Sequence, residues 1–495
     1  MAVFNKAQVA QKITNKAGGI AYDYDSANKL ADYLLTEMFR PKYYGNSVIQ
    51  DMPLLVKQNS PEFLAKALWF SRNVGGLRSV SAFLMALLAT DLRFKGKECA
   101  KELFYSALRR PDDALEAWAA IKSLTGKHYL PKAFRKAVKK AFEQKWDAYQ
   151  LRKYLKANSE FSLSDLVKMA RPNPSLHKSG DREIFRKVIE GTLPAIQTAQ
   201  TVNASTSKDG AERLTAYKAM LREDKLGFLA LLRNIAKLYG QGDKELDSLI
   251  LETLQDHARA DKALIMPSDV ALAYWSGVNK DEQLKEALES LFVHRAIKTP
   301  LINAGDYPVV LIDGSGSMWK QPEFDAVITA MQLIAAIPET RVAIFATKWE
   351  DISPLRRDKS VFDWAERYFN ISTDTNNRYA RCKKDVGYAT YVESALKALY
   401  SESVTHIFIL SDMQLYGQRE ISNPLGHYAQ KRGFKKAVLW DLNSNARGKP
   451  FDIKSGKVVS LSGYSGKLVE FLPEMLETGD NLADIIIKKS PEFNC

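Results

Sequence analysis

The 495-residue chain shows two successive patterns of hydrophobic and polar positions. From about Asp25 to Arg295, apolar residues recur every three or four positions, and breakers such as Pro61 and Pro111 separate the segments. This spacing is typical of amphipathic helices joined by short turns, whereas strand-like alternation is scarce. The pattern therefore predicts an all-α helical-repeat domain over residues 1–298, although no exact sequence period marks a repeat.

The pattern changes near Thr299, where short apolar runs begin to alternate with helical segments. Alternating strands and helices are typical of a doubly wound α/β sheet, which binds ligands at the carboxyl ends of its strands. We therefore predict an α/β domain over residues 299–495. The predicted strands are 307–312, 341–347, 405–411 and 437–442, and the predicted helices are 323–337 and 390–400. Residues 350–386 form a long polar insertion, for which a solvated loop is the simplest interpretation.

The composition, 46% hydrophobic and 26% charged, is that of an ordinary globular protein. No apolar run has the length of a membrane span and the N-terminus lacks a secretory hydrophobic region, so we expect a cytoplasmic location and no membrane contact. Cys99, Cys382 and Cys495 are too few and too widely spaced for a disulfide framework or a zinc signature. We expect three reduced thiols.

Positive charge is concentrated in the helical part. The net charge is +13, and residues 1–300 carry 47 basic against 34 acidic side chains, while residues 301–495 carry 24 of each. Residues 101–200 alone hold 20 basic against 11 acidic side chains. This local surplus predicts a surface that binds a polyanion, and a solvated basic face is the alternative.

The segment 131–142 divides apolar from basic positions along one predicted helix. Its apolar residues on the core face are Phe134, Val138, Ala141 and Phe142. Its lysines at matching spacing around the rest of the helix are Lys132, Lys136, Lys139 and Lys140. Such a row fits phosphate groups, with an affinity that falls as salt rises, while a solvated amphipathic face is again the alternative.

A different chemistry lies between Tyr307 and Met318, where an apolar strand runs into the loop Asp-Gly-Ser-Gly-Ser. This loop combines one charged carboxylate with two neutral hydroxyl oxygens, a set that suits a hard divalent cation such as Mg2+. A threonine and a second aspartate stand at later helix and strand boundaries. The predicted metal ligands are Asp313, Ser315, Ser317, Thr390 and Asp412. A ligand set made only of oxygen argues against zinc.

Other interpretations of this loop explain less. Trp319 occupies the position of the third glycine in a dinucleotide-binding fingerprint, and the loop does not spell the Gly-x-Ser-x-Gly of a nucleophile elbow. A capped strand-to-helix turn without metal accounts for the first loop but not for Thr390 and Asp412. The three motifs in this order resemble the metal-ion-dependent adhesion site of von Willebrand factor A domains.

The helical part carries a second resemblance. Three segments, in family order, are similar to the TROVE module of the Ro autoantigen family: residues 70–84, 161–174 and 229–235. With the adhesion-site domain that follows, the resemblance covers nearly the whole chain. It implies a monomeric ring of HEAT-like repeats whose ends are clamped by a von Willebrand factor A domain.

The resemblance implies a noncatalytic RNA-binding protein. The family binds small noncoding Y RNAs on the outer basic surface of the ring, and misfolded RNAs whose single-stranded ends enter it. By this resemblance the RNA-binding residues are Lys132, Arg135, Lys136, Lys139 and Lys140. Mg2+ is then the expected cofactor, and an exoribonuclease such as polynucleotide phosphorylase is a candidate partner. This chain has Leu163 where many members carry an RNA-contacting histidine.

Two other functions remain open from the residues alone. A metal-assisted phosphoesterase would use Asp313 and Asp412, but two-metal cleavage needs several bridging ligands and the motif offers few carboxylates. A protein-only adhesion module would leave the concentrated basic charge of the helical part without a role. Residues 350–386 are a solvated loop or a further RNA contact in the Ro-like interpretation.

Overall fold

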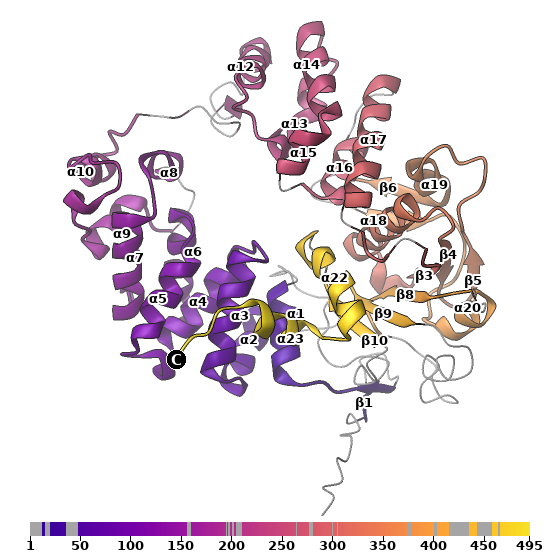
Figure 1. Cartoon of the computed structure of the whole chain (residues 1–495), viewed down its shortest axis with the longest axis horizontal. Helices are drawn as coiled ribbons and strands as arrows, with labels where there is room; N and C mark the ends of the chain where they lie inside the picture. The colour runs from indigo at the N-terminus through magenta and orange to yellow at the C-terminus, as the bar shows by residue number, and fades with distance from the viewer. Residues whose placement is uncertain are drawn as a thin grey trace, which may run out of the picture. The chain divides into compact units, whose positions relative to one another are not determined.

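The computed structural model divides into two compact units, Asp25–Gln197 with Leu482–Cys495, and Met1–Tyr24 with Thr198–Asn481 (Figure 1). We call them the N-terminal helical unit and the sheet-containing unit. The structure describes residues 12–14, 20–35, 48–155, 160–194, 196, 199, 202–203, 210–263, 265–276, 281–298, 300–303, 305–373, 379–399, 403–414, 435–442, 458–463 and 466–495. No helix within these ranges is both long and apolar enough to cross a membrane.

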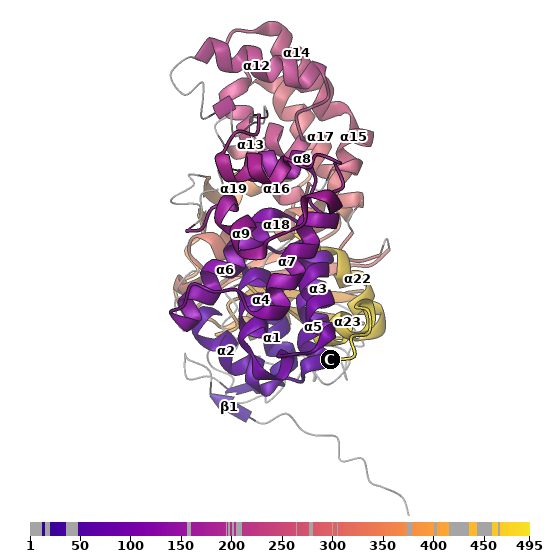
Figure 2. The ribbon, with the colours of Figure 1, turned by 90° about the vertical axis from the view of Figure 1, so that its left-hand side faces the viewer.

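The N-terminal helical unit consists of short helices that pack side by side (Figures 1 and 2). Its helices are α1 (Ser26–Leu35), α2 (Val48–Gln58), α3 (Pro61–Asn73), α4 (Ser79–Thr90), α5 (Glu98–Ala107), α6 (Pro111–Thr125), α7 (Lys132–Gln144), α8 (Ala148–Tyr154), α9 (Leu163–Ala170), α10 (Ile184–Glu190) and α23 (Leu482–Lys489). Helix α4 is apolar on all sides and is buried from Val80 to Leu88, where it packs against α6. Helix α5 packs against α7 in the same way.

The end of the chain packs in this same unit. Helix α23 lies on α1 and α3, where the Ala483 amide donates to Asn28 Oδ1 at 3.2 Å. Beyond it, Lys66 Nζ lies 2.6 Å from Glu492 Oε1, and Cys495 forms a disulfide with Cys99 of α5. The expectation of three reduced thiols is therefore wrong for two of them. Sequence spacing could not reveal the pair because packing, across a separation of 396 residues, brings the two Cα atoms to 5.6 Å.

The sheet-containing unit begins with a short hairpin of β1 (Lys12–Thr14) and β2 (Ile20–Tyr22) and continues with further helices. These are α12 (Gly210–Arg222), α13 (Phe228–Leu238), α14 (Lys244–Gln255), α15 (His257–Lys262), α16 (Pro267–Trp275) and α17 (Glu282–Lys298). Helix α17 packs against α14 and α16 and also against the first helix of the α/β part, α18 (Gln321–Ala336).

The six-stranded sheet has the order β10-β9-β8-β3-β4-β5. Its strands are β3 (Pro308–Asp313), β4 (Arg341–Phe345), β5 (Trp349–Asp351), β8 (His406–Ser411), β9 (Lys436–Asp441) and β10 (Val458–Ser462). All neighbours are parallel except β5, which pairs antiparallel with β4 at one edge. The observed strands and helices begin and end within a few residues of the predicted bounds. The predicted fold class, helical repeats with an α/β domain, is confirmed, and β5 and β10 were not predicted.

Both faces of this sheet are covered by helices. Val309 and Leu311 of the central strand β3 face an apolar cluster that includes α20 (Val392–Leu399), while α18 packs against β3 and β8. Helix α22 (Gly466–Thr478) packs against the outer strand β10. A strand buried on both faces reads as a continuous apolar run, which explains the sequence Val-Val-Leu-Ile of β3. The carboxyl edge of β3 is thereby held rigidly.

Residues 350–386 are not a simple solvated loop. They contain α19 (Val361–Tyr368) and the hairpin of β6 (Phe369–Ser372) and β7 (Tyr379–Cys382). Phe362 and Trp364 are fully buried, and Phe362 stacks on Tyr274 of α16 with ring centroids 3.9 Å apart. The sequence pattern did not predict α19, because only one face of this helix packs and polar residues separate its few apolar ones.

Candidate functional site

The predicted metal ligands lie at the carboxyl edge of the parallel sheet. Asp313 is the last residue of β3, and Asp412 directly follows the last residue of β8, the neighbouring strand. Ser315 and Ser317 belong to the turn that leads from β3 toward α18. Because parallel strands end at the same edge, residues distant in sequence meet there.

Hydrogen bonds link four of the five predicted ligands. The Ser315 amide donates to Asp313 Oδ1 at 2.9 Å, and the Ser315 and Ser317 Oγ atoms are 3.3 Å apart. The Ser317 hydroxyl hydrogen-bonds in turn to the Asp412 carboxylate. The other oxygen of Asp313, Oδ2, accepts from the Ser411 hydroxyl at 2.6 Å. Asp313, Ser315 and Asp412 are buried, so the cluster is a compact polar group at the sheet edge.

Thr390 lies at the same edge but is joined to the other four by no hydrogen bond among the described residues. It is 7% exposed and stands two residues before α20. The amide of the next residue, Tyr391, donates to Ala346 O just beyond the end of β4, which fixes the segment beside β3. The structure thus brings Thr390 to the correct edge, and its part in metal binding stays a prediction.

Two glycines allow the loops to come this close. A Cβ atom on Gly314 would lie 2.9 Å from Ile344 Cδ1. Gly387 has φ +80°, and a Cβ there would lie 2.5 Å from Thr347 Oγ1, the atom that accepts from the Tyr388 and Ala389 amides. Only glycine combines this conformation with this close approach.

The electrostatics of the cluster favour a bound cation. Burial raises the pKa of Asp313, although hydrogen bonds from Ser411 and Ser315 oppose the shift. Burial also raises the pKa of Asp412, and the nearby charge of Asp313 raises it further. Two desolvated carboxylates so close together repel one another, as the effect of Asp313 on the pKa of Asp412 shows, and a divalent cation with oxygen ligands would relieve that repulsion. The donor set of carboxylates and hydroxyls therefore fits Mg2+.

Sequence analysis missed two residues of this edge. The hydroxyl of Ser411 orients Asp313, and Asp441, the last residue of β9, is a third buried carboxylate whose charge raises the pKa of Asp412. Asp441 ends an apolar strand, and Asp412 follows one in the same way. An acidic residue at the end of a predicted strand could therefore have identified Asp441 as part of this edge. Within the described part of the chain, no three His, Cys, Asp or Glu side chains are arranged to hold a metal, which leaves Asp441 outside the ligand set.

The predicted RNA-binding residues lie on α7 in the N-terminal helical unit. The apolar face of α7 is buried, and Phe134 meets Phe104 of α5 edge to face at 6.0 Å between ring centroids. Lys132, Arg135 and Lys136 are exposed, and none of the three forms an ion pair with an acidic side chain in the described ranges.

The other two basic residues of α7 already have acidic partners. Lys140 Nζ lies 2.8 Å from Glu102 Oε2 of α5 and 4.4 Å from the ring centroid of Tyr105. Lys139 Nζ lies 3.9 Å from Glu143 Oε1, one turn along the same helix. The five predicted residues therefore share one helix but not one electrostatic state. Lys139 and Lys140 have acidic partners, whereas the other three form no ion pair within the described residues, although the charge of Lys136 lowers the pKa of Glu98.

Leu163, at the family's histidine position, is a core residue. It is the first residue of α9, follows the N-cap Ser162, and is 1% exposed. The preceding Phe161 stacks on Trp118 with ring centroids 3.9 Å apart. A buried leucine cannot replace a histidine that contacts RNA, so any RNA contact in this region must come from other side chains.

The fold defines a class of protein in which helical repeats are joined to an α/β domain with a mostly parallel six-stranded sheet. A comparison with solved structures finds a similar fold in the crystal structure of the Ro (RSR) protein of Deinococcus radiodurans. The likeness has a TM-score of 0.61 at 16% sequence identity, and it covers 91% of this chain and 100% of that one. No family model and no curated protein sequence matches the chain. The Ro resemblance of the sequence is thus confirmed at the level of the fold.

Proposed function

We propose that this chain is a noncatalytic RNA-binding protein with a Ro-like fold. It binds small structured noncoding RNA, Y-like in kind, on the exposed face of α7, and it also takes misfolded RNA with single-stranded ends. The observation that carries the proposal is the group of three exposed basic side chains on α7 that are unpaired within the described residues, Lys132, Arg135 and Lys136. The Ro-like fold over nearly the whole chain supports the same function.

Helix α7 suits a phosphate backbone for a geometric reason. Lys132, Arg135 and Lys136 are three and four residues apart, so their side chains rise from neighbouring positions on one helical surface. Their apolar neighbours anchor that surface in the core, which leaves little conformational freedom to lose in the backbone when RNA binds. The contact is made to phosphates, and it therefore selects RNA shape rather than base sequence.

The five predicted metal ligands, here called the adhesion-like cluster, would bind a partner other than the RNA on α7. Asp313 and Asp412 would hold Mg2+ through their carboxylates, with Ser315, Ser317 and Thr390 as neutral oxygen ligands. A bound Mg2+ offers an open position to an oxygen of a partner molecule, such as an acidic side chain. The family resemblance points to an exoribonuclease such as polynucleotide phosphorylase as that partner, with RNA as a second tether.

A binding role accounts for this cluster better than hydrolysis. Two-metal cleavage of a phosphoester needs carboxylates that bridge two ions, and the predicted ligand set has only two carboxylates. The proposal predicts that labelled RNA stays intact when it is incubated with the purified chain and Mg2+ or Mn2+. Cleavage that disappears in Asp412→Ala would replace the binding role by a phosphoesterase.

RNA that copurifies with the full chain tests the main proposal. Crosslinking followed by sequencing should recover small structured RNAs with the wild type, and far less RNA with Lys132→Glu/Lys136→Glu. The control is Lys397→Glu, which makes the same Lys-to-Glu change once, on the exposed side of α20 in the sheet-containing unit, and so shifts the net charge half as far as the double variant. Equal recovery from all three proteins would refute the role of α7.

A further inference from the structure

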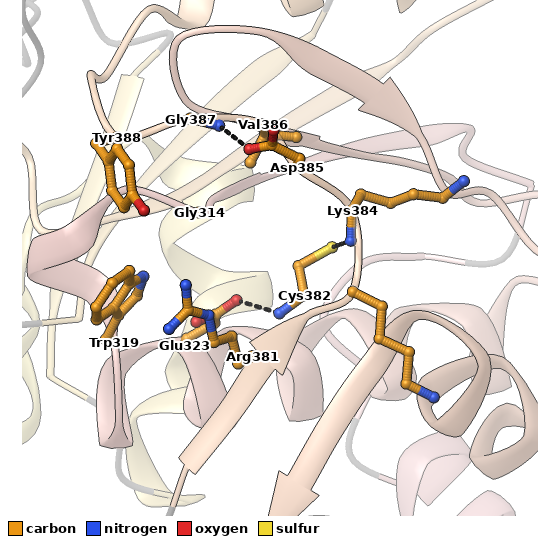
Figure 3. A pocket seen from close by; sticks show the side chains of 11 residues that line it. Gly314, Trp319, Glu323, Arg381, Cys382, Lys384, Asp385, Val386, Gly387 and Tyr388 are labelled. Carbon is orange, nitrogen blue, oxygen red and sulfur yellow. Dashed lines mark hydrogen bonds between the residues drawn. The ribbon is translucent and has the colours of Figure 1, made fainter.

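A pocket of about 210 Å³ lies beside the adhesion-like cluster in the sheet-containing unit. Gly314, beside the predicted metal ligand Asp313, forms part of its wall. The remaining lining comes from Trp319, from Glu323 of α18, from the end of β7 and from residues 383–388 (Figure 3). It is not part of the predicted metal site. Its size suits one small planar ring or an ionic group, because drug-sized ligands occupy pockets of at least about 300 Å³.

Two exposed aromatic rings stand at one side of the pocket. Trp319 is 38% exposed and Tyr388 is 69% exposed, and their ring centroids are 5.9 Å apart at a tilt of 60°. Figure 3 shows the two side chains one above the other, facing the same space. Two exposed aromatic side chains that stand together at the edge of a pocket offer a surface on which a nucleobase can stack.

Positive charge adjoins these rings. The Arg381 guanidinium lies over Trp319, with Cζ 3.9 Å from the ring centroid, and both Lys383 and Lys384 are exposed. In Figure 3 the Arg381 side chain lies next to Trp319, whereas the Lys384 side chain extends away from both rings. An arginine held in place by an aromatic ring is suited to a phosphate group, because its planar donors are already oriented.

The floor of the pocket holds a polar atom without a partner. Glu323 is 1% exposed, and its Oε1 accepts from the Cys382 amide at 2.9 Å. Its other oxygen, Oε2, is buried and has no hydrogen-bond partner among the described residues. Burial raises the pKa of Glu323 to about 8, so its carboxyl group is mostly protonated at neutral pH and can donate a hydrogen bond. An unsatisfied buried polar atom is costly, and a ligand atom would satisfy it.

We propose that this pocket binds one unpaired nucleotide of single-stranded RNA. The base stacks against Trp319 and Tyr388, its polar edge faces Glu323, and Arg381 meets the phosphate. An acidic peptide is the other conceivable ligand, but it would leave the two rings without a role. The inference rests on the proposed binding of RNA with single-stranded ends. Because it concerns a different surface from α7, an experiment can refute the pocket proposal without refuting the α7 proposal, and the reverse.

The test measures the affinity of the full chain for a short labelled single-stranded oligonucleotide by fluorescence anisotropy. Tyr388→Ala and Trp319→Ala should each weaken binding about 5- to 150-fold, the range for loss of one base–aromatic stack. Tyr388→Phe keeps the ring and should bind as the wild type does. The matched control is Tyr307→Ala, an exposed tyrosine that precedes β3 at the opposite edge of the sheet.

Glu323 provides an independent arm of the test. In Glu323→Gln the Cys382 amide holds the new amide oxygen, so the NH2 group faces the pocket and a donor is retained. This variant should bind within about 2-fold of the wild type, whereas Glu323→Leu should lose about 2- to 10-fold. Far-UV circular dichroism checks that each variant folds.

Binding of a second, structured RNA distinguishes the proposed surface on α7 from the proposed pocket. Tyr388→Ala should leave the affinity for a small structured RNA unchanged, and Lys136→Glu should lower that affinity. Wild-type affinity for the single strand in both Tyr388→Ala and Trp319→Ala would overturn the pocket proposal while leaving the α7 proposal intact. Displacement of the oligonucleotide by an oligo-aspartate peptide that needs Trp319 and Arg381 would also overturn it, in favour of an acidic protein ligand.

Discussion

Replacement of Asp313 by asparagine should stabilise the metal-free protein. Burial raises the pKa of Asp313 from its ordinary value of 3.8 to about 6. A carboxyl group with a higher pKa in the folded state binds more protons when the protein is folded than when it is unfolded. Its contribution to stability is therefore fully present below about pH 4 and is lost as the pH rises to about 6 and beyond. Asp412, whose pKa is also raised, acts in the same direction.

The size of the effect follows from this pKa and from two hydrogen bonds. The rise for Asp313 corresponds to ~3 kcal/mol of stability lost at neutral pH. Asparagine removes that loss, but its amide nitrogen replaces one oxygen that accepts from Ser315 or Ser411, at a cost of about 1 kcal/mol. We expect Asp313→Asn to be about 2 kcal/mol more stable than the wild type at neutral pH without metal.

Magnesium should reverse this order. A cation that binds only the folded state stabilises it by about 2.7 kcal/mol at a hundred times its dissociation constant, and it needs the Asp313 charge. Urea unfolding at about pH 5 and about pH 8, with EDTA or with Mg2+, measures both effects. The expected results are a wild type that gains stability with Mg2+ and an asparagine variant that does not.

Asp306→Asn is the matched control for this measurement. Asp306 is buried just before β3, at the amino end of the sheet, and its Oδ1 lies 2.9 Å from Lys435 Nζ. Loss of that ion pair should destabilise the protein and leave the response to Mg2+ unchanged. The reasoning fails if Asp313→Asn is less stable than the wild type in EDTA at about pH 8, or if Mg2+ stabilises both proteins equally.

Two further predictions concern the backbone and the chain end. Gly387→Ala should destabilise the protein by about 1–3 kcal/mol and weaken Mg2+ binding, because φ is +80° and the new Cβ would collide with Thr347; calorimetric titration and urea unfolding measure both. Cys99→Ser, or reduction of the disulfide to Cys495, should remove up to about 5 kcal/mol of stability and speed proteolysis of the last residues, whereas Cys382→Ser should not. Proteolysis at the wild-type rate after reduction would contradict the disulfide's role.

Much of the α/β part could be predicted because its signals are local. The apolar run of β3 and the alternation of strands with helices depend on burial from both faces, which leaves a continuous hydrophobic stretch in the sequence. The order of neighbouring strands then brings Asp313 and Asp412 together, and a motif at strand ends is enough to predict this. Helix α19 escaped prediction because its buried face is short and interrupted by charged residues.

Features that depend on packing between distant segments could not be predicted. The pairing of Lys140 with Glu102 depends on how α5 lies against α7, so a row of lysines in the sequence overstated the free charge of that helix. The pocket near Glu323 is lined by residues of α18 and of β7. It could not be predicted because β7 lies in an insertion that the sequence pattern assigned to a loop. The disulfide depends on the packing of α23 against α1 and α3.

The salt dependence of RNA binding tests the central proposal most directly. Affinity for a small structured RNA is measured across a salt series for the wild type, Lys136→Ala and Lys140→Ala. Lys136 is exposed and forms no ion pair with a described acidic residue, although its charge acts on Glu98. It should contact phosphate, so its loss should weaken binding and reduce the slope of log affinity against log salt by about 1. Lys140 must first leave Glu102, so its loss should change both quantities less. An unchanged slope and affinity in Lys136→Ala would contradict the account.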